Sequence, residues 1–334
     1  MADTLLEVSD LSVRFDTDDG PVHAVDKMSF SLAPGEVLGI VGESGCGKSV
    51  TSLAILGILP RAGRVTGGRA LFEGEDLIGR PDRELRKIRG KEIAMIFQDP
   101  MTSLNPVLTI GRQIRESIEA HFDLDRKEAE KRVVELLDQV GIPEAKRRAR
   151  DYPHQFSGGM RQRAMIAMAL ACEPKLLIAD EPTTALDVTI QAQILDLLRA
   201  LVAERDTALV MITHDLGVVA GMCERVHVMY GGMVMETGPA EDVFRSPRHP
   251  YTLGLLQSVP RLDTPRGRKL HPIEGAPRDM LRPPSACPFA PRCAYEVEQS
   301  RQEVPPLVEI APGHKVACFN PVPEDAWLNE VARA

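Results

Sequence analysis

The stretch Gly42-Glu-Ser-Gly-Cys-Gly-Lys-Ser49 fits the pattern G-x-x-x-x-G-K-[ST] of a phosphate-binding loop. It follows the apolar run Val37-Leu-Gly-Ile-Val41, a predicted buried strand, and precedes a predicted helix over residues 49–59. Glycines let backbone N–H groups close around phosphate oxygens, and the helix N-terminus adds partial positive charge. We expect Lys48 to contact the β- and γ-phosphates and Ser49 to hold Mg²⁺. The alternative is a plain glycine-rich turn.

Strand and helix patterns alternate on both sides of this loop. Residues 5–32 are predicted to form antiparallel strands with a turn at Asp18-Asp-Gly-Pro21. Further strands are predicted at 93–97, 175–179 and 209–213, and helical periodicity at 110–142, 158–172 and 190–203. Alternating strands and helices imply a largely parallel sheet covered on both faces, so the predicted fold class is α/β.

Charge and hydropathy exclude several classes of protein. The 334 residues carry 40 Lys+Arg against 48 Asp+Glu, a net charge of −8, which disfavours a basic nucleic-acid binder. No apolar run approaches the roughly 18 residues that span a bilayer. The acidic N-terminus lacks the basic region and apolar core of a secretory signal. We expect the chain to stay in the cytoplasm, with any membrane spans supplied by another chain.

Proline marks a division in the chain. Sixteen of the 26 prolines lie between Pro239 and Pro323, and helices and central strands tolerate proline poorly. We therefore predict a first domain over residues 1–238 and a loop-rich extension over residues 239–334.

An apolar strand that ends in two carboxylates, Leu176-Leu-Ile-Ala-Asp-Glu181, is the second sign of phosphate chemistry. Such a strand delivers its last side chains to the carboxyl edge of the sheet, where a phosphate loop also lies. We expect Asp180 to support Mg²⁺ and Glu181 to polarise the attacking water. The alternative is an acidic cap for the next helix.

The stretch Phe156-Ser-Gly-Gly-Met-Arg-Gln-Arg163 discriminates best between families. By itself it is a helix N-terminus with Ser157 as its cap, and it serves either to bind an anion or only to cap the helix. From Ser157 onward it resembles the signature motif of ABC-type ATPases, with Met160 where that family usually has Gln. The other motifs follow in the family's order: Gln98 at the Q-loop, Thr184-Ala-Leu-Asp187 at the D-loop, His214 as the switch histidine and Phe15 as the adenine-stacking aromatic.

The resemblance covers roughly residues 5 to 240. It implies a P-loop ABC-type ATPase domain with an antiparallel β subdomain and an α-helical subdomain at about 100–165. In this family two ATPase domains pack head to tail, so Ser157, Gly158 and Gly159 would act on the partner's ATP. The implied catalytic residues are Glu181, His214 and Gln98.

The resemblance also implies a set of residues for ATP and Mg²⁺. Those for the nucleotide are Phe15, Gly42, Ser44, Gly45, Cys46, Gly47, Lys48, Ser49, Val50, Asp180, Ser157, Gly158, Gly159 and Asp187. Those for Mg²⁺ are Ser49, Gln98 and Asp180. For Cys46, two interpretations stand: a thiol whose pKa the helix N-terminus lowers, or a small residue that fits the loop.

Two further stretches indicate a branch of the family. Gln98-Asp-Pro-Met-Thr-Ser-Leu-Asn-Pro106 and Arg248-His-Pro-Tyr-Thr-Leu-Gly-Leu-Leu256 resemble ATP-binding subunits of dipeptide and oligopeptide importers. This implies a second, related ATP-binding subunit, two transmembrane permeases, an extracytoplasmic binding protein, and a place at the cytoplasmic face of the membrane. A permease helix is expected to dock near residues 98–108. Other cargo (nickel, glutathione, oligosaccharides or antimicrobial peptides) and a soluble ABC-type ATPase are the alternatives.

The extension carries Cys287 and Cys293 in Cys-Pro-Phe-Ala-Pro-Arg-Cys, and Cys318 further on. Thiolates hold a small, loop-rich region together when a metal binds. Some subunits of this branch have four such cysteines and a [4Fe-4S] cluster, but Ser300 stands where the third is expected. Three interpretations stand. The first is a three-cysteine iron–sulfur cluster with Ser300, His314 or another group as the fourth ligand, the second is zinc at a Cys₃-His-like site, and the third is three unligated buried thiols.

Overall fold

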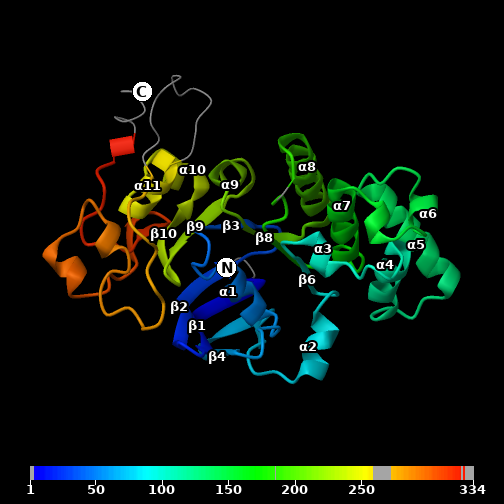
Figure 1. Cartoon of the computed structure of the whole chain (residues 1–334), viewed down its shortest axis with the longest axis horizontal. Helices are drawn as coiled ribbons and strands as arrows, with labels where there is room; N and C mark the ends of the chain where they lie inside the picture. The colour runs from blue at the N-terminus through cyan, green and yellow to red at the C-terminus, as the bar shows by residue number, and fades with distance from the viewer. Residues whose placement is uncertain (1–3, 185, 259–271, 325, 328–334) are drawn as a thin grey trace. The chain divides into compact units, whose positions relative to one another are not determined.

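The computed structural model describes residues 4–184, 186–258, 272–324 and 326–327. The chain forms two compact units (Figure 1). Unit 1 comprises Met1–Thr4, Leu32–Glu36 and Gly79–Ile212. Unit 2 comprises Leu5–Ser31, Val37–Ile78 and Thr213–Ala334.

Unit 2 contains a sheet with the strand order β2-β1-β4-β5. The strands are β1 (Leu6–Thr17), β2 (Gly20–Leu32), β4 (Gly63–Phe72) and β5 (Glu75–Asp76). β1 and β4 are antiparallel, with Leu6 opposite Phe72. Alternate β1 residues such as Leu6 and Val8 are buried, as expected for a strand with one face on the core. The predicted strands within residues 5–32 are confirmed.

A second set of strands in unit 2 runs in the order β11-β12-β10-β9-β3. These are β3 (Val37–Val41), β9 (Arg225–Tyr230), β10 (Met233–Pro239), β11 (Val308–Ala311) and β12 (His314–Val316). β3 and β9 are parallel, whereas β10 is antiparallel to both β9 and β12. The proline-rich extension therefore adds two short strands to a sheet, which its composition did not predict.

The helices of unit 2 include α1 (Lys48–Ile55), α9 (Leu216–Met222), α10 (Ala240–Arg245) and α11 (Pro250–Ser258). The predicted helix after the phosphate loop is confirmed but ends at Ile55 rather than near residue 59. Gly57 has φ 64°, a left-handed conformation that glycine adopts easily and that ends a helix.

Unit 1 is built on three parallel strands, β6 (Ile93–Ile96), β7 (Leu176–Asp180) and β8 (Ala208–Ile212). β7 and β8 are buried along their whole length, which explains their continuous apolar runs. The helices α7 (Gly158–Ala169) and α8 (Val188–Arg205) confirm the predicted helices around 158–172 and 190–203. Shorter helices are α2 (Asp82–Ile88) and α3 (Pro100–Ser103).

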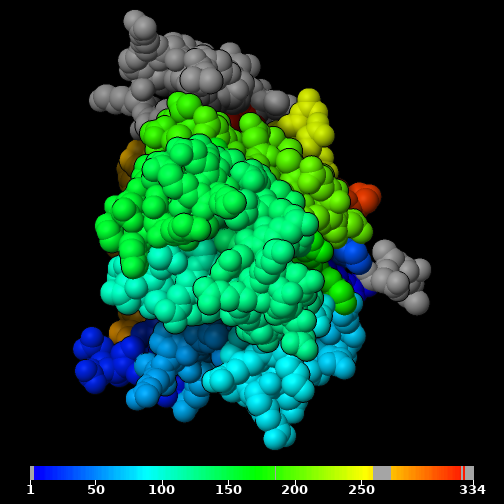
Figure 2. Space-filling model, turned by 90° about the vertical axis from the view of Figure 1, so that its right-hand side faces the viewer, coloured from blue at the N-terminus to red at the C-terminus, as the bar shows by residue number. Residues whose placement is uncertain are grey.

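The helical part of unit 1 corrects one prediction. The periodicity over 110–142 belongs to two helices, α4 (Ile110–Glu119) and α5 (Arg126–Gln139), followed by α6 (Ala145–Arg148). Asp125 begins α5 with a capping box: its carboxylate accepts the N–H of Glu128, and the Glu128 carboxylate accepts the N–H of Asp125. Figure 2 looks onto these helices. The apolar residues at helical spacing along α5 and at its C-terminal end are buried in full: Ala129, Val133, Leu136, Leu137 and Val140.

Candidate active site

The phosphate loop of unit 2 joins β3 to α1 in the predicted way. Gly47 has φ 104°, and a Cβ there would lie 2.3 Å from the backbone oxygen of Ala24. At Gly42, a Cβ would lie 2.2 Å from the backbone oxygen of Met229. Both positions therefore need glycine, because neighbouring strands approach the loop too closely for a side chain. At the tip of the loop, Ser44 and Gly45 are exposed, while Ser49 and Val50 at the start of α1 are half-buried.

Lys48 lies inside this loop. Its side chain is buried, and the ammonium donates to the carbonyl oxygens of Gly42 at 2.8 Å and Glu43 at 3.0 Å. Cys46 is buried beside it, and burial raises the pKa of the thiol. The prediction that the helix N-terminus lowers the pKa of this thiol is wrong, because desolvation outweighs the neighbouring positive charge of Lys48. The burial of Cys46 supports the other interpretation, a small residue that fits the loop.

Unit 1 brings Gln98 and Glu181 together. β6 and β7 pair in parallel with Ile96 opposite Ala179, so the residues that follow both strands meet at one edge of the sheet. The Gln98 side-chain amide donates to the Glu181 carboxylate at 2.8 Å, and the Thr184 hydroxyl donates to the same oxygen at 2.8 Å. Two residues predicted to be catalytic are therefore in direct contact, and their catalytic roles stay predictions.

The backbone of Glu181 is in an unusual conformation. Its φ of 46° lies in the left-handed region, which non-glycine residues seldom adopt. Its N–H donates to the carbonyl oxygen of Ile212, at the end of β8, at 2.8 Å. Such strained residues persist only where their surroundings hold them. Asp180, the preceding residue, is buried at the end of β7.

The signature stretch forms the N-terminus of α7. The Ser157 hydroxyl accepts the N–H of Met160, which confirms the predicted cap. Ser157 and Gly158 are exposed. A Cβ at Gly159 would lie 2.7 Å from a methyl of Ile190 on α8, so glycine allows the two helices to pack. Asp187 is exposed and caps α8 by accepting the N–H of Ile190; Ala185 of the same motif lies outside the described residues.

Two further predicted residues lie in unit 2. Phe15 on β1 is half-buried opposite Gly63, and its ring occupies the space where a side chain at position 63 would be. His214 is exposed and lies two residues after the end of β8. The next residue, Asp215, begins α9 by accepting the N–H groups of Gly217 and Val218. The roles predicted for Phe15 and His214 stay predictions.

The cysteine segment does not support the expected metal centre. Within the described ranges, no group of three or more His, Cys, Asp or Glu side chains is placed to hold a metal ion. Burial raises the pKa of Cys293 and of Cys318 to about 11, with neighbouring thiols acting in the same direction. The two residues considered as a fourth ligand are engaged: the Ser300 hydroxyl accepts the N–H of Val297, and His314 Nε2 pairs with Glu236 at 2.8 Å.

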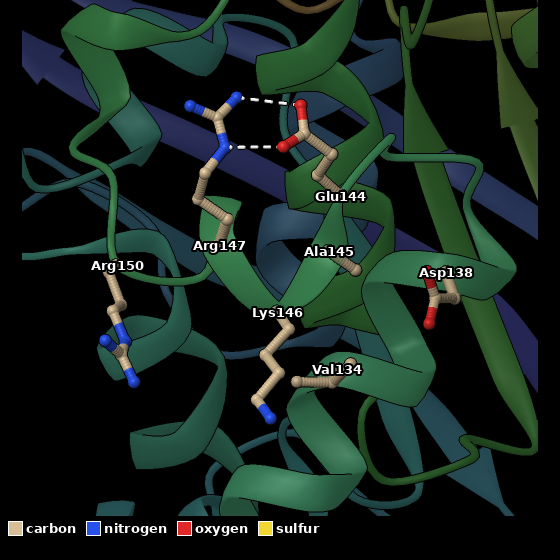
Figure 3. A pocket seen from close by; sticks show the side chains of 7 residues that line it. All are labelled: Val134, Asp138, Glu144, Ala145, Lys146, Arg147 and Arg150. Atoms are coloured by element: carbon tan, nitrogen blue, oxygen red, sulfur yellow. Dashed lines mark hydrogen bonds and ion pairs between the residues drawn. The ribbon is translucent and has the colours of Figure 1, made fainter.

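A hollow of about 550 Å³ on α5 and α6 is separate from all predicted site residues. Figure 3 shows its lining: Val134, Asp138, Glu144, Ala145, Lys146, Arg147 and Arg150. Glu144 and Arg147 form two hydrogen bonds of 2.8 and 2.9 Å there. Both side chains are more than half exposed, and a pair of this kind contributes little to stability or function.

A phosphate loop with a buried lysine, and a glutamate fixed by hydrogen bonds directly after β7, define the class as a P-loop ATPase. Family models refine the class. The model described as "ABC transporter" matches residues 25–184, and "Oligopeptide/dipeptide transporter, C-terminal region" matches residues 235–299. The oligopeptide transport ATP-binding protein OppD of Salmonella typhimurium is 55% identical over 97% of this chain and 96% of its own length. The dipeptide transport ATP-binding protein DppD of Bacillus subtilis is 53% identical over 94% of each chain.

Solved structures agree on the fold. A dimeric ATP-binding cassette in a post-hydrolysis state with ADP and Pi is 29% identical, with a TM-score of 0.64 over 70% of this chain and 98% of its own. The protein cbiO1 of Clostridium perfringens is 31% identical, with a TM-score of 0.61 over 72% of this chain and 91% of its own. The chain belongs to the family of ATP-binding subunits of oligopeptide and dipeptide ABC transporters, and it is an ATPase of the ABC fold.

Three residues at the site were missed at the level of sequence. Thr184 was noted only as part of a motif, not as a partner of Glu181. Tyr251 and Arg292 both bond to Glu43 of the phosphate loop, 208 and 249 residues away. Tyr251 lies in the stretch Arg248–Leu256 and Arg292 between Cys287 and Cys293, but no local pattern in either stretch signals a partner so far away in the sequence.

Proposed function

We propose that this chain hydrolyses ATP to power the import of short peptides across a membrane. The observation that carries the proposal is its likeness, over nearly the whole length of both chains, to oligopeptide and dipeptide transport ATP-binding proteins. The likeness includes the C-terminal region particular to peptide transporters as well as the ATPase motifs. The phosphate loop and the held Glu181 supply the groups that ATP hydrolysis needs.

The proposed residue roles in hydrolysis are those that the resemblance to ABC-type ATPases implies. Lys48 and the N–H groups of the phosphate loop bind the phosphates, and Phe15 stacks on adenine. Ser49 and Asp180, with Gln98, are the proposed residues for Mg²⁺, an ion that neutralises phosphate charge when bound. Glu181 takes the proton from the attacking water, and His214 contacts the γ-phosphate. Most of the rate enhancement in such transfer comes from positioning and charge stabilisation.

We further propose a dimer with a second, related ATP-binding subunit. The N-terminus of α7 supports this part of the proposal, because Ser157 and Gly158 are exposed there and available to an ATP held by another chain. N–H groups at a helix N-terminus favour an anion. Asp187 at the start of α8 is exposed as well, as a contact to a partner requires.

The membrane partners in the proposal are two permease subunits and an extracytoplasmic binding protein. None of the helices in the described part of the chain is long and apolar enough to cross a bilayer. Residues around the Q-loop expose large apolar side chains: Phe97 40%, Met101 63% and Val107 75%. Such a patch suits contact with a permease helix. The proposal puts the chain at the cytoplasmic face of the membrane.

The test is ATP hydrolysis by the assembled transporter in vesicles. Peptides of two to five residues, supplied with the binding protein, should stimulate hydrolysis. Nickel, glutathione, oligosaccharides and antimicrobial peptides are the comparison substrates, and stimulation by one of these alone would contradict peptide cargo. Iron or zinc in the extension stays a separate prediction of the sequence, measured as metal content after anaerobic purification with Cys293→Ala as the control.

A further inference from the structure

Glu43, the second residue of the phosphate loop, is bonded at every polar group. Its N–H donates to the Tyr251 hydroxyl at 2.8 Å, and its carbonyl oxygen accepts from Lys48 at 3.0 Å. Its carboxylate accepts two hydrogen bonds from the Arg292 guanidinium, at 2.6 and 3.0 Å. Two of these partners, Tyr251 and Arg292, come from the C-terminal extension. The extension therefore holds both the backbone and the side chain of one loop residue.

Arg292 is fixed before it reaches Glu43. Its Nε donates to the carbonyl oxygen of Glu274 at 3.0 Å, and a terminal nitrogen donates to that of Ile273 at 3.2 Å. The other terminal nitrogen donates to the Tyr230 hydroxyl at 3.3 Å. Only 5% of the Arg292 side chain is exposed. A two-bond pair between a buried guanidinium and a partly buried carboxylate is strong and fixed in direction.

The Tyr251 side chain is also fixed by its surroundings. It is fully buried on α11, and its ring packs against Tyr230 and Phe289, with centroids 4.8 and 5.2 Å apart. The N-terminus of α11 is anchored by the Glu236 carboxylate, which accepts the N–H groups of Arg248 and His249 at 2.8 and 2.9 Å. A continuous set of contacts thus runs from β10 through α11 to the phosphate loop.

The charge on Glu43 gives this arrangement a function. A carboxylate in a phosphate-binding loop repels the phosphates of ATP, and the repulsion is strong where water is excluded. The guanidinium of Arg292 neutralises that carboxylate and turns it toward the extension. Without Arg292, an unpaired charge would remain next to the bound phosphates.

We propose that the C-terminal extension holds the phosphate loop in the conformation that binds ATP. Arg292 is a positioning residue that neutralises the Glu43 carboxylate, and Tyr251 fixes the loop backbone. This inference rests on the proposed role of the loop in binding ATP. The competing explanation is that Arg292 only attaches the extension to the rest of unit 2. The two explanations differ in what happens when the charge on Glu43 is removed as well.

The experiment is calorimetric titration of the full-length chain with ATP and Mg²⁺. Arg292→Ala should weaken ATP binding by about tenfold or more, since it leaves a partly buried carboxylate unpaired. The double variant Glu43→Gln with Arg292→Ala should recover most of the loss, although the attachment is still missing. Arg301→Ala is the matched control, because Arg301 forms a similar two-bond pair with Glu296 on the surface of the extension; it should bind ATP like the wild type.

Thermal unfolding of each variant shows whether it is folded. If Arg292→Ala binds ATP with wild-type affinity, the proposal is overturned. It is also overturned if the double variant binds ATP as weakly as Arg292→Ala alone, since Arg292 would then only attach the extension to the rest of unit 2. Lys48→Ala separates this test from the proposed function. If the wild type fails to bind ATP, or if Lys48→Ala binds it equally well, the loop is not the ATP site and both proposals fall.

Discussion

At the scale of single residues, Glu181 depends on contacts from three segments of unit 1. The carbonyl oxygen of Ile212, at the end of β8, accepts the N–H of Glu181. Gln98, which follows β6, and Thr184 both donate to the same oxygen of the Glu181 carboxylate. These contacts leave the side chain little freedom to rotate. A fixed carboxylate is what general-base catalysis requires, because the proton must be accepted in one direction.

Glu181→Gln keeps the shape of the side chain but cannot accept a proton from water. We expect ATP turnover to fall about a hundredfold or more, while ATP still binds. Phosphate release and ATP titration of the same preparation measure the two effects. Glu173→Gln is the control, since Glu173 also has a positive φ of 55° and pairs with Arg132 at the surface. Turnover at the wild-type rate in Glu181→Gln would refute the assignment.

Gly47→Ala tests the need for glycine in the phosphate loop. Gly45 and Gly47 both have positive φ, so alanine at either costs roughly 1–2 kcal/mol of backbone strain. Only at position 47 would the Cβ also meet a backbone oxygen, at 2.3 Å, whereas position 45 has open space. Gly47→Ala should therefore unfold at a clearly lower temperature than Gly45→Ala. Equal melting temperatures would contradict the close approach of Ala24.

At the scale of elements, the sequence predicted those whose signals are local. The strand at Val37–Val41, the cap at Ser157 and the apolar face of α5 follow from periodicity and capping within a few residues. β11 and β12 were missed, because they are short and lie between prolines. Their partner β10 is far along the chain, with Glu236 opposite Val316. The split of α4 from α5 was missed because both helices keep the same apolar period.

The residues of the site also divide into those with a local sequence signal and those without one. Short local motifs predicted the residues of the phosphate loop and Glu181, whereas Gln98 was predicted only through the family resemblance. The contact of Arg292 with Glu43 joins residues 249 positions apart. It depends on how the extension folds back onto unit 2, so no spacing rule anticipates it.

A buried histidine on β9 predicts how stability depends on pH. The His227 ring is buried near Phe30, and neither ring nitrogen has a hydrogen-bond partner among the described residues. Burial lowers its pKa to about 3, and the charges of Arg225 and Lys315 act in the same direction. In the unfolded chain the pKa returns to about 6.5. Between these values only the unfolded state binds the proton, so stability falls as the pH drops below 6.5.

We expect His227 to account for about 2 kcal/mol of lost stability between neutral pH and pH 5. His227→Leu should remove that part of the pH dependence. Urea unfolding of both proteins at pH 7 and pH 5 measures it. An unchanged difference between the two pH values would show that His227 is not the group responsible.

At the scale of the whole molecule, the chain is one subunit of an ABC transporter. Its ATP-site residues, its exposed signature motif and its apolar patch around the Q-loop serve three different partners in the proposal: the nucleotide, a second ATP-binding subunit and a permease. The extension adds a fourth role, because it holds the phosphate loop from within unit 2. In the proposal, other chains select the cargo, so the cargo has to be identified with the assembled transporter.

The most direct test is uptake of isotopically labelled di- and tripeptides by cells that lack their own copy of this subunit. Cells that carry this chain should take up the peptides, and cells that carry the Glu181→Gln form should not. The same Glu181→Gln protein, once purified, should still bind ATP. Equal uptake in both cell lines, while the purified variant binds ATP without hydrolysing it, would contradict the claim that this chain drives peptide import.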